Sequence, residues 1–441
     1  MVITERFFRS GVVPGGNKWA LLLFCLIGYS ILNRGFAYIG YYPFFIGEFT
    51  LFFYLLKINH KIELPKFLGT LAGKMWVILF LYNLIIFLFS VLNDINESIR
   101  NSIVWVYTIF FYVGYCYGNS LSKQKAIPRF ELFIFICSNL TIFYFILFPF
   151  RSELRDFTMF VYGSNALVGY YSTLHALSIG FIFYFIFYRS LRFRTIWISL
   201  GLFLIIFVSQ ARASILAIGF IYLYIIFMSK SKKAFWSIII AFCTAFLFLF
   251  IIEMMGINLH IEGQRGDASF DFFQNLLSSI FFESDINSLD GTRTHRLDMW
   301  KYVIEKVFST LLSASFGLGY NVVLIDRATG IDPETGLQTI LRYPHNSFVS
   351  VLGFSGVIGL IFYCIFIGLI LYRIIRVSRS KNISSLILLK WYPVFLIGYS
   401  VSAFFSTVLE APFHNFVFWI ISGVIYSIAT QPKNQLRLQS Y

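Results

Sequence analysis

The sequence predicts an all-α polytopic membrane protein. Hydrophobic residues make up 58% of the chain, charged residues only 13%, and the mean hydropathy is +0.75. About a quarter of the residues of a typical soluble domain are charged, so this composition excludes a water-soluble fold. Apolar runs recur along the chain, and only the segment between 257 and 345 is polar over a long distance.

About twelve apolar stretches come close to the roughly 20 residues that a helix needs to cross ~30 Å of hydrocarbon. They fall near 19–35, 38–56, 75–93, 102–118, 130–149, 166–188, 195–210, 212–228, 234–255, 346–372, 385–408 and 413–430. Residues 1–18 contain Arg6, Arg9 and Lys18 but no small-residue cleavage site. We therefore expect 19–35 to be a retained helix rather than a signal peptide.

The basic residues predict that both termini lie in the cytoplasm. Most of the 35 lysines and arginines fall in the segments that this orientation places inside, as expected where basic loops resist translocation. The short outer segments contain no lysine, and their arginines are Arg34, Arg100, Arg151, Arg155 and Arg212. The formal charge of +14 is thus mainly a topology signal and gives little support to a nucleic-acid partner.

The chain divides into three regions on this basis. Residues 1–256 hold helices one to nine, residues 257–345 form a large polar outer loop, and residues 346–441 hold helices ten to twelve and a cytoplasmic tail. The five cysteines all lie inside predicted spans, and the sequence has neither a metal-ligand motif nor a glycine-rich nucleotide cradle. We therefore predict neither a metal nor a cofactor.

One helix is predicted within the outer loop, over Arg296–Leu312. Its apolar residues follow helical spacing: Leu297, Trp300, Val303, Ile304, Val307 and Leu311. Such an amphipathic helix would lie with one face on the membrane or on the helix bundle. Gly317 and Gly319 then give a turn signal and a stop.

Arg212 begins a predicted span directly after Ser209 and Gln210, at the tip of a tight outer hairpin. The helix dipole disfavours a cation at a helix amino terminus by ~0.3–1 kcal/mol, whereas the free N–H groups there favour a phosphate. The Arg212 guanidinium and the free N–H groups of this helix end together predict an anion-binding site. The alternative is an interfacial arginine whose guanidinium reaches lipid headgroups.

Arg293 and Arg296 would share one face if the loop helix extends back to residue 293, because they are three residues apart. This would concentrate positive charge beside the apolar face. The alternative is a pair of solvated loop charges.

His345 follows Pro344 and precedes Asn346 and Ser347, either of which could cap the tenth span. An imidazole near a helix amino terminus and arginines should stay neutral at physiological pH, the state a general base requires. The alternative is an interfacial histidine without a chemical role.

Glu410 and His414 lie between the last two predicted spans and face outward in this topology. They could line the same chamber as His345. The preferred alternative is a polar turn.

The order of these motifs resembles that of the O-antigen ligase and polymerase superfamily. The matching residues are Arg212 in SQARASILAIG, Arg296 to Trp300 in RLDMW, Gly317 and Gly319 in FGLGY, and His345 in PHNSF followed by Gly353, Gly356 and Gly359. The resemblance covers about residues 205–365, and the first 200 residues match in hydropathy alone.

The resemblance implies a GT-C-type glycosyltransferase fold and an inverting, metal-independent transfer of a glycan from undecaprenyl pyrophosphate. In this family pattern Arg212 and Arg296 bind the pyrophosphate, and His345 activates the acceptor hydroxyl. Arg293, Asn346, Glu410 and His414 are the candidate substrate-binding residues. The partners expected are the lipid-linked oligosaccharide, membrane lipid and a regulator of chain length, and the site would face the periplasm from the bacterial inner membrane.

The amino-terminal run NRGFAYIGYYPFFIGEF resembles those of exopolysaccharide and O-antigen polymerases, and it favours a polymerase. A ligase that transfers finished glycan to lipid A core is the alternative within the family. A transporter or flippase of lipid-linked sugars is the alternative outside it. Transporters usually have related halves and charges near the bilayer midplane, whereas this chain has no evident repeat and places its notable charges at the outer rim.

Overall fold

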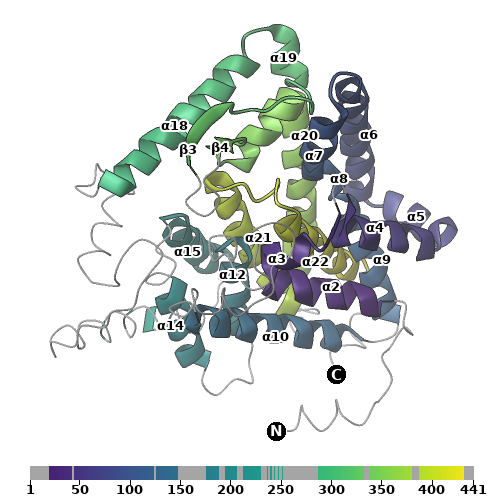
Figure 1. The fold of residues 1–441 in the computed structure, drawn as a ribbon. Coiled ribbons are helices and arrows are strands. Elements are labelled where there is room, and N and C mark those ends of the chain that lie inside the picture. Colours follow the sequence, from purple (N-terminus) through teal and green to yellow (C-terminus); the bar gives the residue numbers. More distant parts are fainter. Residues whose placement is uncertain are drawn as a thin grey trace.

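The computed structural model describes residues 19–41, 44–123, 126–147, 175–187, 194–205, 212–229, 287–331, 338–379 and 387–431, together with single positions between 236 and 251. These residues are almost entirely helical (Figure 1). The strands are two short antiparallel hairpins, β1 (Gly40–Tyr41) with β2 (Phe44–Phe45), and β3 (Arg327–Ile331) with β4 (Gln338–Leu341). The predicted all-α class is confirmed.

The helices of the first half are α2 (Ala20–Ile31), α3 (Asn33–Ala37), α4 (Ile46–Lys57), α5 (His60–Leu68), α6 (Leu71–Val91), α7 (Ile95–Asn101), α8 (Ile103–Val106), α9 (Ile109–Lys123), α10 (Ile127–Ile146), α12 (His175–Ile182), α13 (Tyr184–Phe187), α14 (Arg194–Phe203) and α15 (Arg212–Tyr224), which continues as a π-helix over Ile225–Ser229. Those of the second half are α18 (Asn287–Val307), α19 (Leu311–Phe316), α20 (Ser347–Ser378), α21 (Ile387–Phe405) and α22 (Pro412–Thr430).

Four helices of the described chain are long and apolar enough to cross a membrane: α6, α20, α21 and α22. They coincide with the predicted spans 75–93, 346–372, 385–408 and 413–430. Shorter apolar helices cover Ala20–Ser30, Leu177–Phe187 and Arg212–Phe227. The protein is therefore an integral membrane protein. Most of the predicted span 234–255 and the hairpin tip before Arg212 lie outside the described residues.

The predicted span 38–56 differs from the structure. Its first part is the β1–β2 hairpin, and only the 12 residues of α4 are helical. A helix of this length is about 18 Å long and cannot cross the hydrocarbon alone. Gly40 explains the break, because its φ of +137° is outside the helical region and disfavoured for residues with a side chain.

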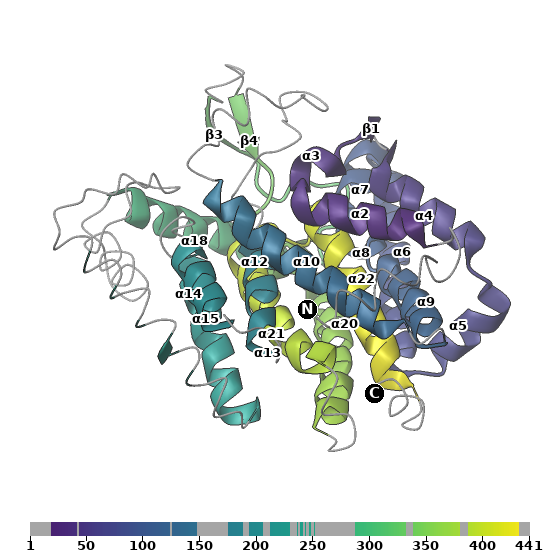
Figure 2. The same cartoon turned by 90° about the horizontal axis from the view of Figure 1, so that it is seen from below.

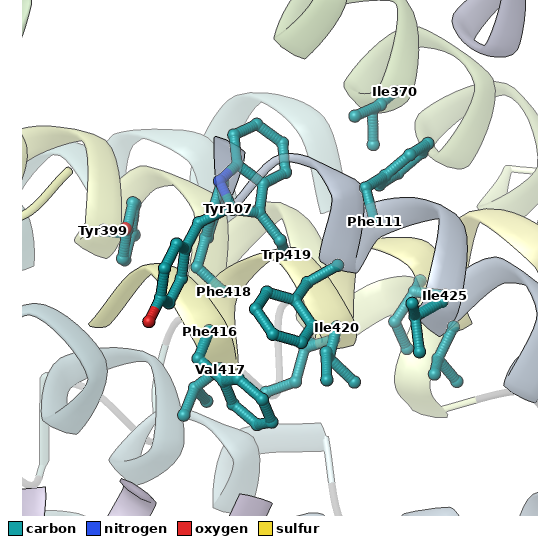
Figure 3. Close-up of a cluster of buried hydrophobic side chains, with 14 of the residues drawn as sticks. Tyr107, Phe111, Ile370, Tyr399, Phe416, Val417, Phe418, Trp419, Ile420 and Ile425 are labelled. Carbon is teal, nitrogen blue, oxygen red and sulfur yellow. The ribbon is translucent and has the colours of Figure 1, made fainter. Parts of the chain in front are cut away.

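The core of the bundle is built around α22, in which every residue from Pro412 to Ala429 is buried. Its aromatic side chains stack on neighbouring helices, as Tyr399 of α21 does on Phe418 with ring centroids 3.8 Å apart (Figure 3). Helix α9 approaches α22 very closely: a Cβ at Gly118 would lie 2.7 Å from the Val424 carbonyl oxygen. Gly114 and Gly118 form a small-residue face of the kind that lets membrane helices pack tightly.

Helix α20 is bent at Gly356, which has a φ of +66° and a ψ of −172°. The segment after α19 fills this bend: Leu318 N donates to Gly353 O at 2.8 Å. Tyr82 of α6 donates to the carbonyl oxygens of Ser315 and Ser355 from the other side. The predicted tenth span thus consists of two helical arms that meet at the non-helical Gly356, and the contacts at this bend hold the first arm against α6 and the segment after α19.

We predict that Gly356→Ala lowers the stability of the folded protein. A Cβ there would stand 2.5 Å from the Gly317 nitrogen, and the backbone conformation is nearly exclusive to glycine, at a cost of order 1–3 kcal/mol. Thermal unfolding in detergent should show a lower midpoint for this variant. Gly368→Ala is the matched control, because it lies in the same helix with open space around it. Equal midpoints for the two variants would contradict the proposed role of the bend.

Candidate functional site

The candidate site centres on His345, which has a φ of +51° and is the non-glycine residue with positive φ in the described chain. The left-handed conformation costs an L-residue roughly 1–2 kcal/mol, so its neighbours must hold it. Figure 2 shows the β3–β4 hairpin at one end of the bundle with α18 across the same end, while α20 and α22 run toward the opposite end. His345 joins this hairpin to α20.

Helix α18 supplies the charge next to His345. It begins at Asn287, so Arg293 and Arg296 lie on one helix three residues apart, as the sequence predicted on condition that the helix reached back that far. It ends at Val307 rather than Leu312, because Thr310 starts the separate helix α19 by accepting a hydrogen bond from Ser313 N. Trp300, one turn after Arg296, donates its indole N–H to Pro344 O at 2.7 Å. This bond fixes α18 against the residue before His345.

The imidazole of His345 is neutral at physiological pH. Burial, the largest cause, and the nearby charges of Arg296 and His295 together lower its pKa to about 4. The sequence predicted a neutral imidazole from the helix end and the arginines. The structure assigns the larger effect to burial, with Arg296 second. Arg296 and His345 are therefore close enough for their charges to interact.

Asn346 and Ser347 fix the other side of His345. Asn346 is the cap of α20, and its side-chain oxygen accepts from Phe348 N at 3.0 Å and Val349 N at 3.1 Å. Ser347 bridges to the loop between α21 and α22: its hydroxyl donates to Glu410 Oε2 at 2.5 Å and accepts from Val408 N and Leu409 N. The cap confirms one of the two predicted capping residues. The side-chain oxygen of Asn346 is therefore already engaged by two backbone N–H groups of α20.

Glu410 and His414 lie close to the start of α20 rather than in an exposed turn. Glu410 is 7% exposed and His414 is 4% exposed, and the His414 ring contacts Phe413. Burial raises the pKa of Glu410, while the bond from Ser347 acts in the opposite direction. Its second oxygen, Oε1, is buried without a hydrogen-bond partner among the described residues. Glu410 thus bonds Ser347, which follows His345 by two residues in the chain. This contact supports a shared site more than a solvated turn.

Arg212 is the first residue of α15, as the sequence predicted, and its side chain is partly exposed. Helix α15 packs against α21, the helix that leads into the Glu410 loop. The structure thus brings Arg296, His345 and Glu410 near the start of α20 and puts Arg212 at the first residue of a helix that packs against α21. That Arg212 shares a ligand with Arg296 stays a prediction.

Several residues of this site were not found by sequence reasoning. Glu97 and Asn101 of α7 bond Arg342 and Tyr343, directly before His345. They lie among the first 200 residues, where no motif marks them. A weak signal existed in the polar run from Asn93 to Asn101, which interrupts an otherwise apolar region.

Residues 197–364 match the family model described as O-antigen ligase. The matched region begins in α14, includes Arg212, Arg296 and His345, and ends in the second arm of α20. A comparison with curated proteins gave no match. The matched region therefore contains the three residues on which the predicted chemistry rests, whereas α7 and Glu410 lie outside it.

We predict that His345 titrates near pH 4 in the folded protein, well below the 6.5 of a free imidazole. Proton-detected NMR of histidine-labelled protein in detergent, with His345→Gln to assign the signal among the six histidines, would measure the value. Arg296→Gln should raise it only partly, because burial remains the larger cause. An ordinary pKa for His345 would show that the imidazole is exposed to water.

Proposed function

We propose that this chain, a member of the O-antigen ligase and polymerase superfamily through residues 197–364, is a polysaccharide polymerase. It transfers a glycan from undecaprenyl pyrophosphate to a lipid-linked repeat unit. The observation that carries the proposal is that the Arg296 guanidinium lies close enough to the largely buried imidazole of His345 to lower its pKa, so that the imidazole stays neutral. One group suits an anionic leaving group and the other suits a hydroxyl nucleophile.

The proposed reaction is a single displacement with inversion at the sugar. The acceptor hydroxyl oxygen forms a bond to C1 of the donor sugar while the bond from C1 to the pyrophosphate oxygen breaks. The hydroxyl proton passes to His345 and then to solvent, and the electron pair of the broken bond stays on the pyrophosphate. General-base assistance of this kind is worth roughly 10²–10⁴-fold in rate.

Arginine is the suitable residue for the leaving group. Its planar fork contacts phosphate oxygens in pairs, and it keeps its charge at all relevant pH values. Arg296 and Arg212 would stabilise charge where it grows in the transition state, so that guanidinium groups take the place of a metal cation. Arg293, on the same helix as Arg296, is a candidate for an outer phosphate contact.

Substrate binding should also raise the pKa of the His345 imidazole. A pKa of about 4 makes free His345 a weak proton acceptor. A bound pyrophosphate brings negative charge close to Arg296 and thereby raises the pKa of the imidazole. The base would thus become effective when the donor is in place. Glu410, with its unpartnered Oε1, is a candidate hydrogen-bond acceptor for an acceptor-sugar hydroxyl.

We also propose a transmembrane topology, a membrane location and a partner for the protein. A GT-C-type arrangement of about twelve spans, both termini in the cytoplasm and a site open to the periplasm would fit the distribution of basic residues. The membrane would then be the bacterial inner membrane. A regulator of chain length is a further candidate partner.

His414 and Asn346 would contribute to the site mainly by supporting the start of α20.

A ligase is the second candidate, and the description of the matching family model favours it. The two reactions share donor, leaving group and base, and they differ in whether the acceptor is a lipid-linked repeat or lipid A core. A flippase is the third candidate and needs no bond to be made. Purified protein in detergent should lengthen a lipid-linked oligosaccharide if it is a polymerase, whereas a flippase would form no new glycosidic bond.

We predict that Arg212→Ala, Arg296→Ala and His345→Ala each lower product formation by at least about 10²-fold, because each removes a transition-state interaction. Product can be measured in detergent with polyprenyl-pyrophosphate-linked repeat units. Arg296→Lys should retain part of the activity, since lysine keeps the charge but loses the fork.

Lys301→Ala is the matched control for Arg296→Ala. It removes a cation from α18, but Lys301 is exposed and pairs only with Glu305 at 3.9 Å. Expression, membrane insertion and activity should stay near wild type. Full activity of all three site variants would refute the assignment of the site.

A deletion strain separates polymerase from ligase. Loss of a polymerase should leave single repeat units on lipid A core, or abolish a capsule. Loss of a ligase should leave long polymer on the polyprenyl carrier. Glycolipid analysis by gel electrophoresis and mass spectrometry distinguishes these products, and stranded long polymer would overturn the polymerase assignment in favour of the ligase.

A further inference from the structure

The segment before His345 is held by a helix from a distant part of the chain. Helix α7 begins at the cap Asp94, which accepts from Asn96 N and Glu97 N. Glu97 forms a salt bridge with Arg342, and each side chain is less than a quarter exposed. Asn101, at the end of the helix, accepts from the Tyr343 hydroxyl at 2.9 Å. Consecutive residues of the segment are therefore bound to successive turns of α7.

Asn101 also connects this segment to the one that follows α19. Its side-chain amide donates to Tyr320 O at 2.9 Å and to Val322 O at 3.1 Å. At 2% exposure, Asn101 makes all three bonds away from water. Such buried amides are costly to leave unsatisfied, so the two segments are held in a single register.

The Tyr320 segment, to which Asn101 donates, is itself held by α6. Tyr320 N donates to Ser90 Oγ at 2.8 Å, and the Tyr320 hydroxyl donates to Asn83 at 2.6 Å. Ring contacts of Tyr320 and Tyr343 with Phe354 extend this network to the first arm of α20. Some of the bonds that hold the segment before His345 thus originate in residues 83–101, outside the matched region, and others come from inside it, such as the bond from Trp300 to Pro344 O.

We propose that Glu97 and Asn101 are positioning residues, which hold Arg342 and Tyr343 so that the His345 imidazole stays buried beside Arg296. The inference rests on the proposed role of His345 as the base. Other anchors of the segment act at different atoms: Trp300 holds Pro344 O, and Glu410 holds Ser347. The α7 pair acts on the side chains of Arg342 and Tyr343, which lie between the hairpin and His345.

The charged groups around His345 determine what a loosened segment would do. Arg296 and His295 face it from α18, Arg342 precedes it, Arg100 and Glu97 lie on α7, and Glu410 lies across Ser347. Release of the segment would admit water and move the imidazole away from Arg296. Both changes would raise the pKa of His345 toward its ordinary value.

The test uses Tyr343→Phe, which removes the hydroxyl bonded to Asn101 and keeps the ring, and Glu97→Gln, which removes the charge paired with Arg342. We expect each to lower kcat by about 10- to 100-fold, because a displacement near 1 Å can cost that much. We expect the acidic limb of the kcat/KM profile to move up from about pH 4 toward 6.5. Asn101→Ala should show both effects more strongly.

Two further variants make the test specific. Glu97→Gln combined with Arg342→Gln should be no worse than the poorer single variant, because both changes remove one interaction. Asn93→Ala is the matched control: Asn93 is exposed and precedes α7, and its side-chain amide donates to Phe89 O. It should leave activity and the pH profile unchanged.

The outcomes separate the inference from the function on which it rests. If His345→Ala retains activity, the proposed function fails. If His345→Ala abolishes activity but Tyr343→Phe and Glu97→Gln keep wild-type kcat and pH profile per folded molecule, the positioning role fails alone. Amounts of folded protein are compared by size-exclusion chromatography, because a purely structural effect would lower yield without moving the acidic limb.

Discussion

The rest of the site depends on a left-handed backbone at His345 that its own residue type does not favour. The conformation persists because residues on both sides are bound to different elements: Pro344 to α18 and Ser347 to the α21–α22 loop. A residue in such a conformation is fixed in direction as well as in place. The backbone at His345 is thereby held in one state, within reach of the charge of Arg296.

Part of the support for the site comes from outside the region that matches the family model. The match covers the residues that would contact a pyrophosphate and a hydroxyl, and also Trp300, which holds Pro344. Other supporting bonds come from α7 and from the loop between α21 and α22, outside that match. This division is consistent with function being carried by a site placed on a variable scaffold.

Local sequence signals predicted the parts of the structure that depend on near neighbours. Apolar length predicted α6, α20, α21 and α22, helical spacing predicted α18, and the asparagine before Ser347 predicted a cap. The bond between Asn101 and Tyr343 joins residues 242 positions apart, and no local pattern encodes it. The bend at Gly356 was hidden for a similar reason, since only packing against the segment after α19 distinguishes this glycine from its neighbours Gly353 and Gly359.

The central position of α22 has a consequence for how the protein is made. This helix is the last that the described chain contains, yet α9 has a glycine face shaped to receive it. During synthesis, that face must wait in lipid or against a temporary neighbour until the carboxyl-terminal helix emerges. The bundle can therefore be completed around its centre only after α22 has been made, and a nascent chain halted before Pro412 would lack the element around which the earlier helices assemble.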